Sequence, residues 1–563
     1  MATLKRVTID PVTRIEGHLR IEVDLDADNV VREAYSSSTL FRGIELVLKN
    51  RDPRDAGLLA QRICGVCTYS HLERATEAVE AALGIQVPPN ARILRNLLHA
   101  ATFMHDHVVH FYHLHAMDWF DPVAALQASP AKAAAEALHY ADTPYNTSEA
   151  TYRAVQARIK QVVDSGQLGP FANGFWGHPA YRLTPEQNLI LLSHYLDALN
   201  VQRIIAQAQA VFGGKNPHPQ TVVVGGVASV MDMEDPSRVG EFLYKMKSAG
   251  QFVSQAYLPD LRLLGQAYKE EAAAGIGNGV PNFMDYGGFP LEDLPWPQAR
   301  ELFVKGVILN RDLSRVHPLD PAKITEDVTH AWYQGPEKGL PPFDEETLPH
   351  YTGLEPDGQL QRSGKYSWIK APRYDGKPME GGPLARLLIA TAAGDEAFIR
   401  LKQQFERDTG WEPSYWFSTV GRTVARGLET ALLAEAVPGW VNELVENVSR
   451  GQTETYRPYE LKDGEGFALG AAPRGALGHW VKIKDGKIAG YQAVVPSTWN
   501  ASPRDHLGQL GPYEAALIHT RLAKPDQPLE VLRTIHSFDP CIACAVHVID
   551  AEGQELAQFE VRG

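Results

Sequence analysis

Two stretches decide the fold of this chain, Arg62-Ile63-Cys64-Gly65-Val66-Cys67 and Asp539-Pro540-Cys541-Ile542-Ala543-Cys544, and together they contain all four cysteines. Each is a Cys-x-x-Cys turn, a spacing that can direct two thiolates at one metal ion, and two such turns make a four-thiolate site. The turns lie near opposite ends of the 563-residue chain. If they share a metal, the two ends of the chain must meet in the interior of the fold.

Several kinds of site fit these cysteines. A disulfide framework is excluded, because four cysteines are too few for so long a chain. A structural zinc site is possible with distant ligands, although a local zinc ribbon would need its two pairs within a few tens of residues. A thioredoxin-like dithiol lacks a βαβ context around either pair. The spacing favours a catalytic thiolate-bound metal or an iron–sulfur cluster over structural zinc.

The composition points to a soluble globular protein. Apolar residues make up 44% and charged residues 22% of the chain. The net charge of −14 argues against a nucleic-acid or anionic-membrane surface. No run approaches the roughly eighteen apolar residues of a membrane-spanning helix. No apolar signal core follows Met1–Arg6, so we expect the chain to cross a membrane only in complex with a signal-bearing partner.

Hydrophobic periodicity predicts an α+β fold. Apolar residues alternate within residues 5–25, which indicates strands, and Asp485-Gly486 between alternating segments indicates a hairpin. Residues 270–380 are rich in Pro and Gly and are expected to be irregular. We therefore expect a large, mainly helical core, a long helix bundle, with peripheral N- and C-terminal β regions that converge on the metal site. Helices are expected over residues 59–83, 90–120, 185–212, from 236 to a break at Pro259, 383–408 and 418–436.

The residues around the cysteines resemble the large subunit of nickel–iron hydrogenases, and the motif sequences are most similar to those of the membrane-associated uptake group. Arg62–Thr68 with His71, and Asp539–His547, carry the resemblance at the two cysteine pairs. Further blocks occur in the same order along nearly the whole chain: Arg14–His18, Phe41–Glu45, His110–His115, Gly213–His218, Ala472–Gly475 and Val495–Asn500.

The resemblance implies a bimetallic centre. By similarity, Cys64, Cys67, Cys541 and Cys544 bind nickel. Cys67 and Cys544 would also bridge to an iron that carries cyanide and carbon monoxide ligands. Heterolytic cleavage of dihydrogen needs a metal to take hydride and a base to take the proton. The base implied by the resemblance is a terminal thiolate, that of Cys541.

Other residues match positions that surround this centre in the family. Arg474 matches an arginine above the metals, with Asp106, Asp539 and Pro473 beside it, although a plain charge partner for either aspartate is an alternative. Glu16 matches the first proton relay; without the resemblance it reads as a strand-end surface glutamate. Three further residues are expected to wall the diatomic ligands of the iron: Val495, Pro496 and Ser497.

A second metal site, for magnesium, is implied at Glu45, His547 and the backbone carbonyl of Ala501, where the family often has leucine. Six histidines gather in a short segment: His99, His105, His107, His110, His113 and His115. We expect these to form a polar helix face packed against the core or a partner, and we place no metal there.

The chain is expected to act with partners. All its cysteines are used at the proposed centre, so an Fe–S electron relay requires a second chain, which agrees with the small subunit of the family. The resemblance further implies dihydrogen as substrate, nickel-insertion chaperones, a maturation protease that cuts after His547, and a membrane cytochrome b as a candidate partner. The expected domains are 1–547, the hydrogenase large-subunit domain, and 548–563, an extension removed from a cytoplasmic precursor before the complex reaches the periplasmic side of the membrane.

Three readings compete with a hydrogen-oxidising enzyme. A hydrogen sensor is disfavoured, because sensor-type relatives generally lack the cleaved extension. A metal-free quinone-reductase subunit of respiratory complexes is disfavoured by the retention of all four cysteines. A structural zinc protein remains, and metal analysis distinguishes it from the enzyme.

Overall fold

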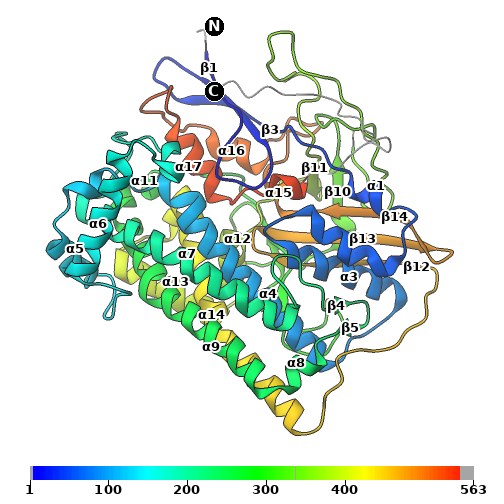
Figure 1. The fold of residues 1–563 in the computed structure, drawn as a ribbon. Coiled ribbons are helices and arrows are strands. Elements are labelled where there is room, and N and C mark those ends of the chain that lie inside the picture. The colour runs from blue at the N-terminus through cyan, green and yellow to red at the C-terminus, as the bar shows by residue number, and fades with distance from the viewer. Residues whose placement is uncertain (1–3, 337, 546–563) are drawn as a thin grey trace.

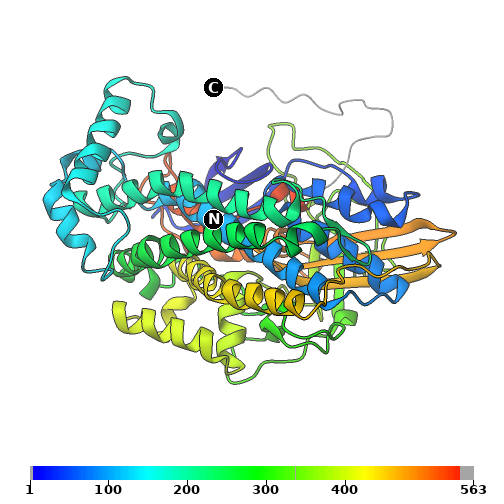
Figure 2. The same cartoon turned by 60° about the horizontal axis from the view of Figure 1, so that its bottom comes forward.

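The computed structural model describes residues 4–336 and 338–545, with the backbone alone for Asn173, Cys544 and Ala545. At its centre long helices lie side by side and bury an extensive apolar core (Figures 1 and 2). These helices are α4 (Pro89–Val109), α7 (Pro185–Gly213), α9 (Pro236–Phe252) and α14 (Thr419–Ser449). The predicted α+β fold with a helical core is confirmed.

Shorter helices surround this bundle. Three of them, α15, α17 and α18, come together with the amino-terminal segment next to the second cysteine pair. The bounds are α1 (Ile44–Leu48), α2 (Ala56–Ala60), α3 (Thr68–Leu83), α5 (Pro130–Ala137), α6 (Glu149–Asp164), α8 (Val230–Glu234), α10 (Leu258–Ala267), α11 (Lys269–Ala273), α12 (Pro383–Ala392), α13 (Glu396–Thr409), α15 (Pro496–Asn500), α16 (Pro512–Leu517), α17 (Leu529–Ser537) and α18 (Ile542–Ala545).

Two antiparallel sheets flank the bundle (Figure 1). The amino-terminal sheet has the order β1 (Lys5–Ile9), β2 (Leu19–Leu25), β3 (Val31–Ser38), and β3 extends the two strands expected from the sequence. The carboxyl-terminal sheet is a meander of β12 (Gly464–Ala472), β13 (Gly475–Lys484) and β14 (Lys487–Val494). The predicted hairpin is confirmed at Asp485 and Gly486, both with positive φ as a tight two-residue turn requires.

Residues 270–380 are mostly irregular, as expected, with short paired strands. The short strands of this region are β6 (Phe283–Asp285), β7 (Gly288–Pro290), β8 (Glu301–Phe303), β9 (Gly306–Ile308), β10 (Ile324–Asp327) and β11 (Ala371–Tyr374). A further short pair, β4 (Val222–Val223) and β5 (Gly226–Val227), precedes it. Among the described residues, no helix combines the length and the apolar character needed to cross a bilayer.

The helix expected over residues 59–83 is wrong in one respect. The chain is helical in α2 and in α3, but Cys64 is extended, with φ −127° and ψ 142°, and Cys67 sits at the N-cap of α3. The Cys-x-x-Cys turn therefore interrupts the helical pattern instead of opening it. This position favours the thiolate form of both cysteines, because the positive end of a helix dipole stabilises negative charge.

Other expected helix boundaries also shift. The predicted break at Pro259 is wrong: after α9 a wider π turn absorbs the irregularity, and α10 continues with Pro259 in its first turn, where a missing N–H is tolerated. The segment 383–408 is two helices separated at Gly394, which has φ 86°. The predicted start of α7 is confirmed, because Thr184 and Gln187 form a capping box.

Candidate metal centre

Three thiols from the two ends of the chain meet in the interior. Cys64 Sγ lies 3.2 Å and Cys67 Sγ lies 3.9 Å from Cys541 Sγ. All three side chains are buried. The backbone of Cys544 lies in α18, but its side chain is outside what the structure describes. Sulfurs this close, with no disulfide geometry, are the donor arrangement expected of a soft metal site, so the residues present fit a thiolate-bound metal.

The amino-terminal segment fixes the second cysteine pair. Glu16 forms a parallel bridge with Cys541: Glu16 N donates to Pro540 O at 3.2 Å, and Ile542 N donates to Glu16 O at 2.7 Å. Gly17 has φ +85°, and a Cβ at this position would lie 2.3 Å from Ala543 N. Only glycine allows the two segments to approach this closely.

The Glu16 carboxylate faces the thiols. Its Oε2 lies 3.1 Å from Cys541 Sγ and accepts from Ala543 N at 3.1 Å. Burial raises the pKa of Glu16 to about 7, and negative charge at Cys64 acts in the same direction, while Arg474 opposes it. A carboxyl group with a pKa near neutrality, in contact with a thiol, is suited to accept and release a proton.

Arg474 sits at the tip of the β12–β13 hairpin and pairs with two aspartates. Its Nη1 lies 3.0 Å from Asp106 Oδ2, on α4, and its Nε lies 3.1 Å from Asp539 Oδ1. The carboxylates and the nearby thiols outweigh burial and raise the pKa of Arg474 well above its ordinary value, so it stays charged. Burial raises the pKa of Asp539 to about 6, despite the opposing charges of Arg474 and Arg426. Both charge partners named as alternatives in the sequence are therefore present at once.

A cavity of about 10 Å³, about the smallest that can hold one water molecule, lies against the thiols. Of the residues expected to wall a ligand space, Pro496 and Ser497 line it, and Ser497 Oγ accepts from Cys541 N at 3.0 Å. Val495 is fully buried in the apolar cluster that contains the cysteines. Pro473 directs its carbonyl at Arg386 Nη2, 3.0 Å away. The residues that line the cavity are Cys67, His71, Ala472, Arg474, Pro496, Ser497 and Cys541.

His71 belongs to the first cysteine block, but the sequence alone did not indicate a role for it. It lies one turn after Cys67 on α3, lines the cavity, and is 1% exposed. Burial lowers the pKa of His71 to about 4, so the ring is neutral at neutral pH. The signal was its spacing, since residues four apart share a helix face.

The expected second metal site is described only in part. Glu45 is buried, its Oε2 accepts from Thr347 Oγ1 at 2.8 Å and its Oε1 from Ala493 N at 3.1 Å. Burial raises the pKa of Glu45. Nearby, Lys370 Nζ pairs with Glu345 at 2.8 Å and with Glu326 at 3.3 Å. Ala501 is buried at the end of α15, and His547 lies outside the described residues.

The histidine-rich segment distributes its rings over separate partners. His107 bonds Glu429 at 2.6 Å, His110 bonds His536 O at 2.7 Å, and His113 bonds Tyr195 O at 3.2 Å. His115 and His536 both contact Asp118 Oδ2, and Arg14 Nη2 pairs with the other oxygen of Asp118. This last group is close enough to hold a metal, but its carboxylate already has two histidines and an arginine as partners. It reads as a buried hydrogen-bonded cluster that anchors α17.

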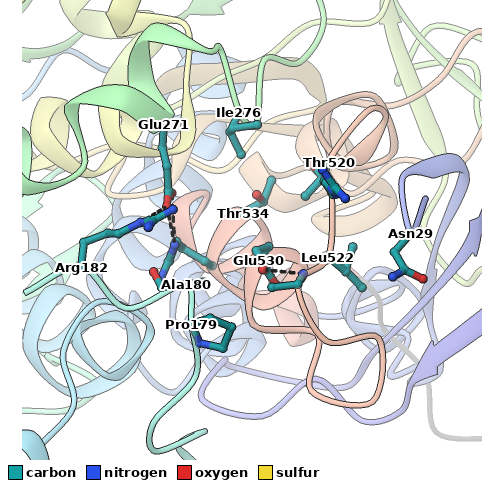
Figure 3. Close-up of a pocket in the computed structure, with 13 residues that line it drawn as sticks. Asn29, Pro179, Ala180, Arg182, Glu271, Ile276, Thr520, Leu522, Glu530 and Thr534 are labelled. Carbon is teal, nitrogen blue, oxygen red and sulfur yellow. Dashed lines mark hydrogen bonds and ion pairs between the residues drawn. The ribbon is translucent and has the colours of Figure 1, made fainter.

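A larger cavity, of about 440 Å³, lies away from the cysteines (Figure 3). Pro179, Arg182 and Glu271 line one side of it, and Leu522 and Glu530 the other. Arg533 on its wall is fully engaged, with Glu271 at 3.1 Å and with the carbonyls of Asp118 and Ala180. The lining has none of the soft donors that gather at the thiol cluster.

Comparisons with known proteins agree with this geometry. Residues 42–547 match the family model described as nickel-dependent hydrogenase, and residues 6–39 match one described as HoxL-like. The chain is 49% identical to the quinone-reactive Ni/Fe-hydrogenase large chain of Wolinella succinogenes, over 99% of this chain and 98% of that protein. It is 46% identical to the uptake hydrogenase large subunit of Bradyrhizobium diazoefficiens, over 99% and 98%, and 43% identical to the hydrogenase-1 large chain of Escherichia coli, over 99% and 97%.

Solved structures give the same picture. The reduced Ni-Fe-Se hydrogenase of D. vulgaris Hildenborough superposes with a TM-score of 0.78 at 34% identity, covering 97% of this chain and all of that one. The H2-activated [NiFeSe]-hydrogenase of Dm. baculatum gives a TM-score of 0.79 at 33% identity, with the same coverage.

Proposed function

Because this chain belongs to the nickel-dependent hydrogenase family and is the catalytic large subunit of a nickel–iron hydrogenase of uptake type, we propose that Cys64, Cys67, Cys541 and Cys544 hold its nickel. Cys67 and Cys544 would also bridge to the iron. The observation that carries this assignment is the approach of Cys64 and Cys67 to Cys541, from opposite ends of the chain, to within 3.2 and 3.9 Å.

We assign the proton path to the side chains beside Cys541. When bound, the two metals supply the electron-pair acceptor that heterolytic cleavage of dihydrogen requires. The Cys541 thiolate accepts the proton, and Glu16 Oε2, 3.1 Å away, takes it onward. Arg474 is a poor base, since its pKa is raised further by Asp539 and Asp106. It instead presents a fixed positive charge to the cavity where the substrate enters.

The residues around the cavity support the assignment of the iron ligands and of the shell around Arg474. Val495, Pro496 and Ser497 would enclose the iron's cyanide and carbon monoxide ligands, where the Ser497 hydroxyl is able to donate to a cyanide nitrogen. Pro473 and Asp106 would complete the shell around Arg474.

We further propose magnesium at Glu45, the carbonyl of Ala501 and His547. Among the described residues, the carboxylates of Glu45, Glu326 and Glu345 are buried in this neighbourhood, and the ammonium of Lys370 pairs with two of them. Buried negative charge in excess of its partners is costly unless a cation neutralises it, and oxygen ligands suit magnesium. Chelation should therefore destabilise the link between α1 and the carboxyl-terminal region.

The electrons would leave through a partner. The four cysteines are all assigned to the metals, so the Fe–S relay belongs to a hydrogenase small subunit, and the two chains form a heterodimer. A relative is named quinone-reactive, which supports a quinone as acceptor, reached through a membrane cytochrome b. We place the mature complex on the periplasmic side of the membrane, exported with the signal-bearing small subunit.

Maturation would proceed in the cytoplasm. Nickel-insertion chaperones load the site, and a protease then removes residues 548–563, leaving a domain of residues 1–547. Both the cut and the extension lie outside the described residues. The intact mass of active enzyme tests the proposal, because active material that still contains Val548 would contradict it.

Metal analysis and turnover test the central assignment. The anaerobically purified enzyme should contain one nickel and one iron per chain, and Cys64→Ser or Cys541→Ser should lose the nickel. Zinc alone would indicate the structural alternative. Full metal content with only very slow hydrogen oxidation would indicate a sensor, a reading that the uptake-type relatives do not favour.

A further inference from the structure

A chain of three hydrogen-bonded side chains runs from the metal cavity into the carboxyl-terminal sheet. His71, which lines the cavity, has its Nδ1 3.2 Å from His479 Nε2. His479 Nδ1 in turn lies 2.6 Å from the hydroxyl of Tyr491. The three side chains are 1%, 0% and 6% exposed, so their hydrogen bonds are sheltered from solvent.

Rigid elements hold this chain in place. His71 is on α3, which packs directly against β12 and β13 of the sheet. His479 is on β13 and Tyr491 on the neighbouring strand β14. The rings meet edge to face, His71 to His479 at 76° and His479 to Tyr491 at 71°.

One tautomer of each histidine allows all these hydrogen bonds to run from Tyr491 toward the cavity. Tyr491 has one hydroxyl proton, and within the described part of the chain its hydrogen-bond partner is His479 Nδ1. With Tyr491 as the donor to Nδ1, a neutral His479 carries its proton on Nε2. That N–H then donates to His71 Nδ1, which leaves the proton of His71, a residue that lines the cavity, on its own Nε2.

We propose that His479 and Tyr491 are positioning residues that fix His71 as the Nε2–H tautomer and so supply a hydrogen-bond donor to the metal cavity beside Cys67. The inference rests on the proposed function, because the acceptor is a metal-bound thiolate or a group bound in the cavity. Negatively charged sulfurs would also favour the Nε2–H tautomer of His71, so the thiolates and the hydrogen bonds from His479 act in the same direction. A hydrogen bond to a metal-bound sulfur withdraws charge from it and raises the reduction potential of the centre.

Tyr491→Phe in the loaded heterodimer tests the start of the chain. It removes the hydroxyl and keeps the ring, so His479 loses the donor that selects its tautomer. We expect the nickel content to stay at the wild-type level, the midpoint potential of the nickel centre to become more negative, and turnover to fall by up to about tenfold. The potential is read from nickel electron paramagnetic resonance during a redox titration.

The matched control is Tyr366→Phe. Tyr366 is also fully buried and also loses a hydroxyl hydrogen bond, to Glu514 at 2.9 Å, but it does not line the cavity. This variant should leave the potential of the nickel centre unchanged. A shift of equal size in both variants would overturn the proposal, since it would come from a general loss of packing or stability.

Substitutions of His479 separate relay from packing. Gln at position 479 keeps an N–H donor for His71 Nδ1 without any need for Tyr491, so His479→Gln should keep a nearly wild-type potential. His479→Leu removes the donor and should shift the potential at least as far as Tyr491→Phe. If Tyr491 acts only through the tautomer of His479, adding Tyr491→Phe to His479→Gln changes nothing further.

Two outcomes contradict the proposed roles of His479 and Tyr491. One is a wild-type potential in Tyr491→Phe, and the other is a double variant whose shift equals the sum of the shifts of Tyr491→Phe and His479→Gln. An absence of any nickel signal in the wild-type enzyme would instead contradict the proposed function, so the two failures are distinguishable.

Discussion

The two cysteine pairs reach the same point by different means. Cys64 and Cys67 belong to a turn that is largely self-contained: Val66 N and Cys67 N both approach Cys64 Sγ, at 3.2 and 3.1 Å, and α3 begins immediately after. Cys541 is held by residues far away in sequence, Glu16 through a backbone bridge and Ser497 through its hydroxyl. The first pair is part of the scaffold, and the second is a segment docked onto it.

The difference indicates how such a centre is assembled. A preformed half-site on α3 and a late-docking half-site near the carboxyl terminus allow metal to be inserted before the centre is closed. The docking contacts should then control metal retention, while the contacts within the first turn should matter less. Single substitutions can separate the docking of the second pair from the chemistry of the centre.

Glu16→Gln should have the largest effect, and on chemistry alone. Its amide oxygen still accepts from Ala543 N and the backbone bridge is intact, so docking and nickel content should be preserved. The amide cannot take the proton of Cys541, so hydrogen oxidation should fall by about 10²–10⁴-fold. Turnover and nickel per chain are measured on the same anaerobic preparation.

Glu514→Gln is the matched control. Burial likewise raises the pKa of Glu514 to about 7, and its partners are Ser36 N and Tyr366, outside the metal cavity. Its replacement should leave turnover within a few-fold of wild type. The proton-relay role of Glu16 fails if both variants lose activity equally or if Glu16→Gln keeps it.

Gly17→Ala should break docking. Its Cβ would lie 2.3 Å from Ala543 N at a φ of +85°, and the strain and overlap together cost about 2–4 kcal/mol. The docked segment should then be populated tens- to hundreds-fold less, and most chains should lack nickel when purified. Elemental analysis measures this directly.

Gly65→Ala provides the comparison on the other half-site. No heavy atom lies within 4 Å of a Cβ at Gly65, and its φ is not positive. Nickel content near the wild-type level is expected. Equal losses in the two glycine variants would remove the distinction between a scaffold pair and a docked pair.

Ser497→Ala should weaken docking more gently. It leaves the buried Cys541 N–H without its acceptor at 3.0 Å, a loss of about 1–2 kcal/mol. Nickel should dissociate roughly tenfold faster under a chelator challenge. Ser537→Ala is the control, because Ser537 is equally buried but its hydroxyl donates to Thr534 O within its own helix. Similar dissociation rates in both variants would show that Ser497 does not hold Cys541.

The same contrast explains how far the sequence could predict the molecule. Spacing within Cys64-Gly65-Val66-Cys67 is local information, and the start of α7 at Thr184 and the hairpin at Asp485 are local too, so these features were predictable. The route past Pro259 was not, because a π turn outside the proline adjusts the helix. The interruption of the helix at Cys64 was missed as well, because its apolar spacing resembles that of a continuous helix.

At the site, the resemblance supplied residue identities and placed Asp106 and Asp539 beside Arg474, but it gave few other contacts. The backbone bridge between Glu16 and Cys541 joins residues hundreds of positions apart, which no periodicity reveals. The role of His71 depends on His479 and Tyr491, which approach it only because α3 packs on the carboxyl-terminal sheet. Tertiary contacts of this kind were beyond sequence reasoning.

The smallest expected effect concerns the amino-terminal sheet, whose β1 and β2 flank the segment that contains Glu16. Burial acts to raise the pKa of Asp24, on β2, but ion pairs with Arg362 and Arg6 outweigh it and lower the pKa below its usual 3.8. A lowered carboxyl pKa stabilises the fold above pH 3.8 and loses this contribution as the pH falls through the folded-state value. Solvent screening limits the contribution to less than about 1 kcal/mol, so Asp24→Asn should lower the thermal midpoint by roughly one degree at pH 6. The difference from wild type should vanish well below pH 3.8. A difference that persists there would mean that packing, and not charge, stabilises this sheet.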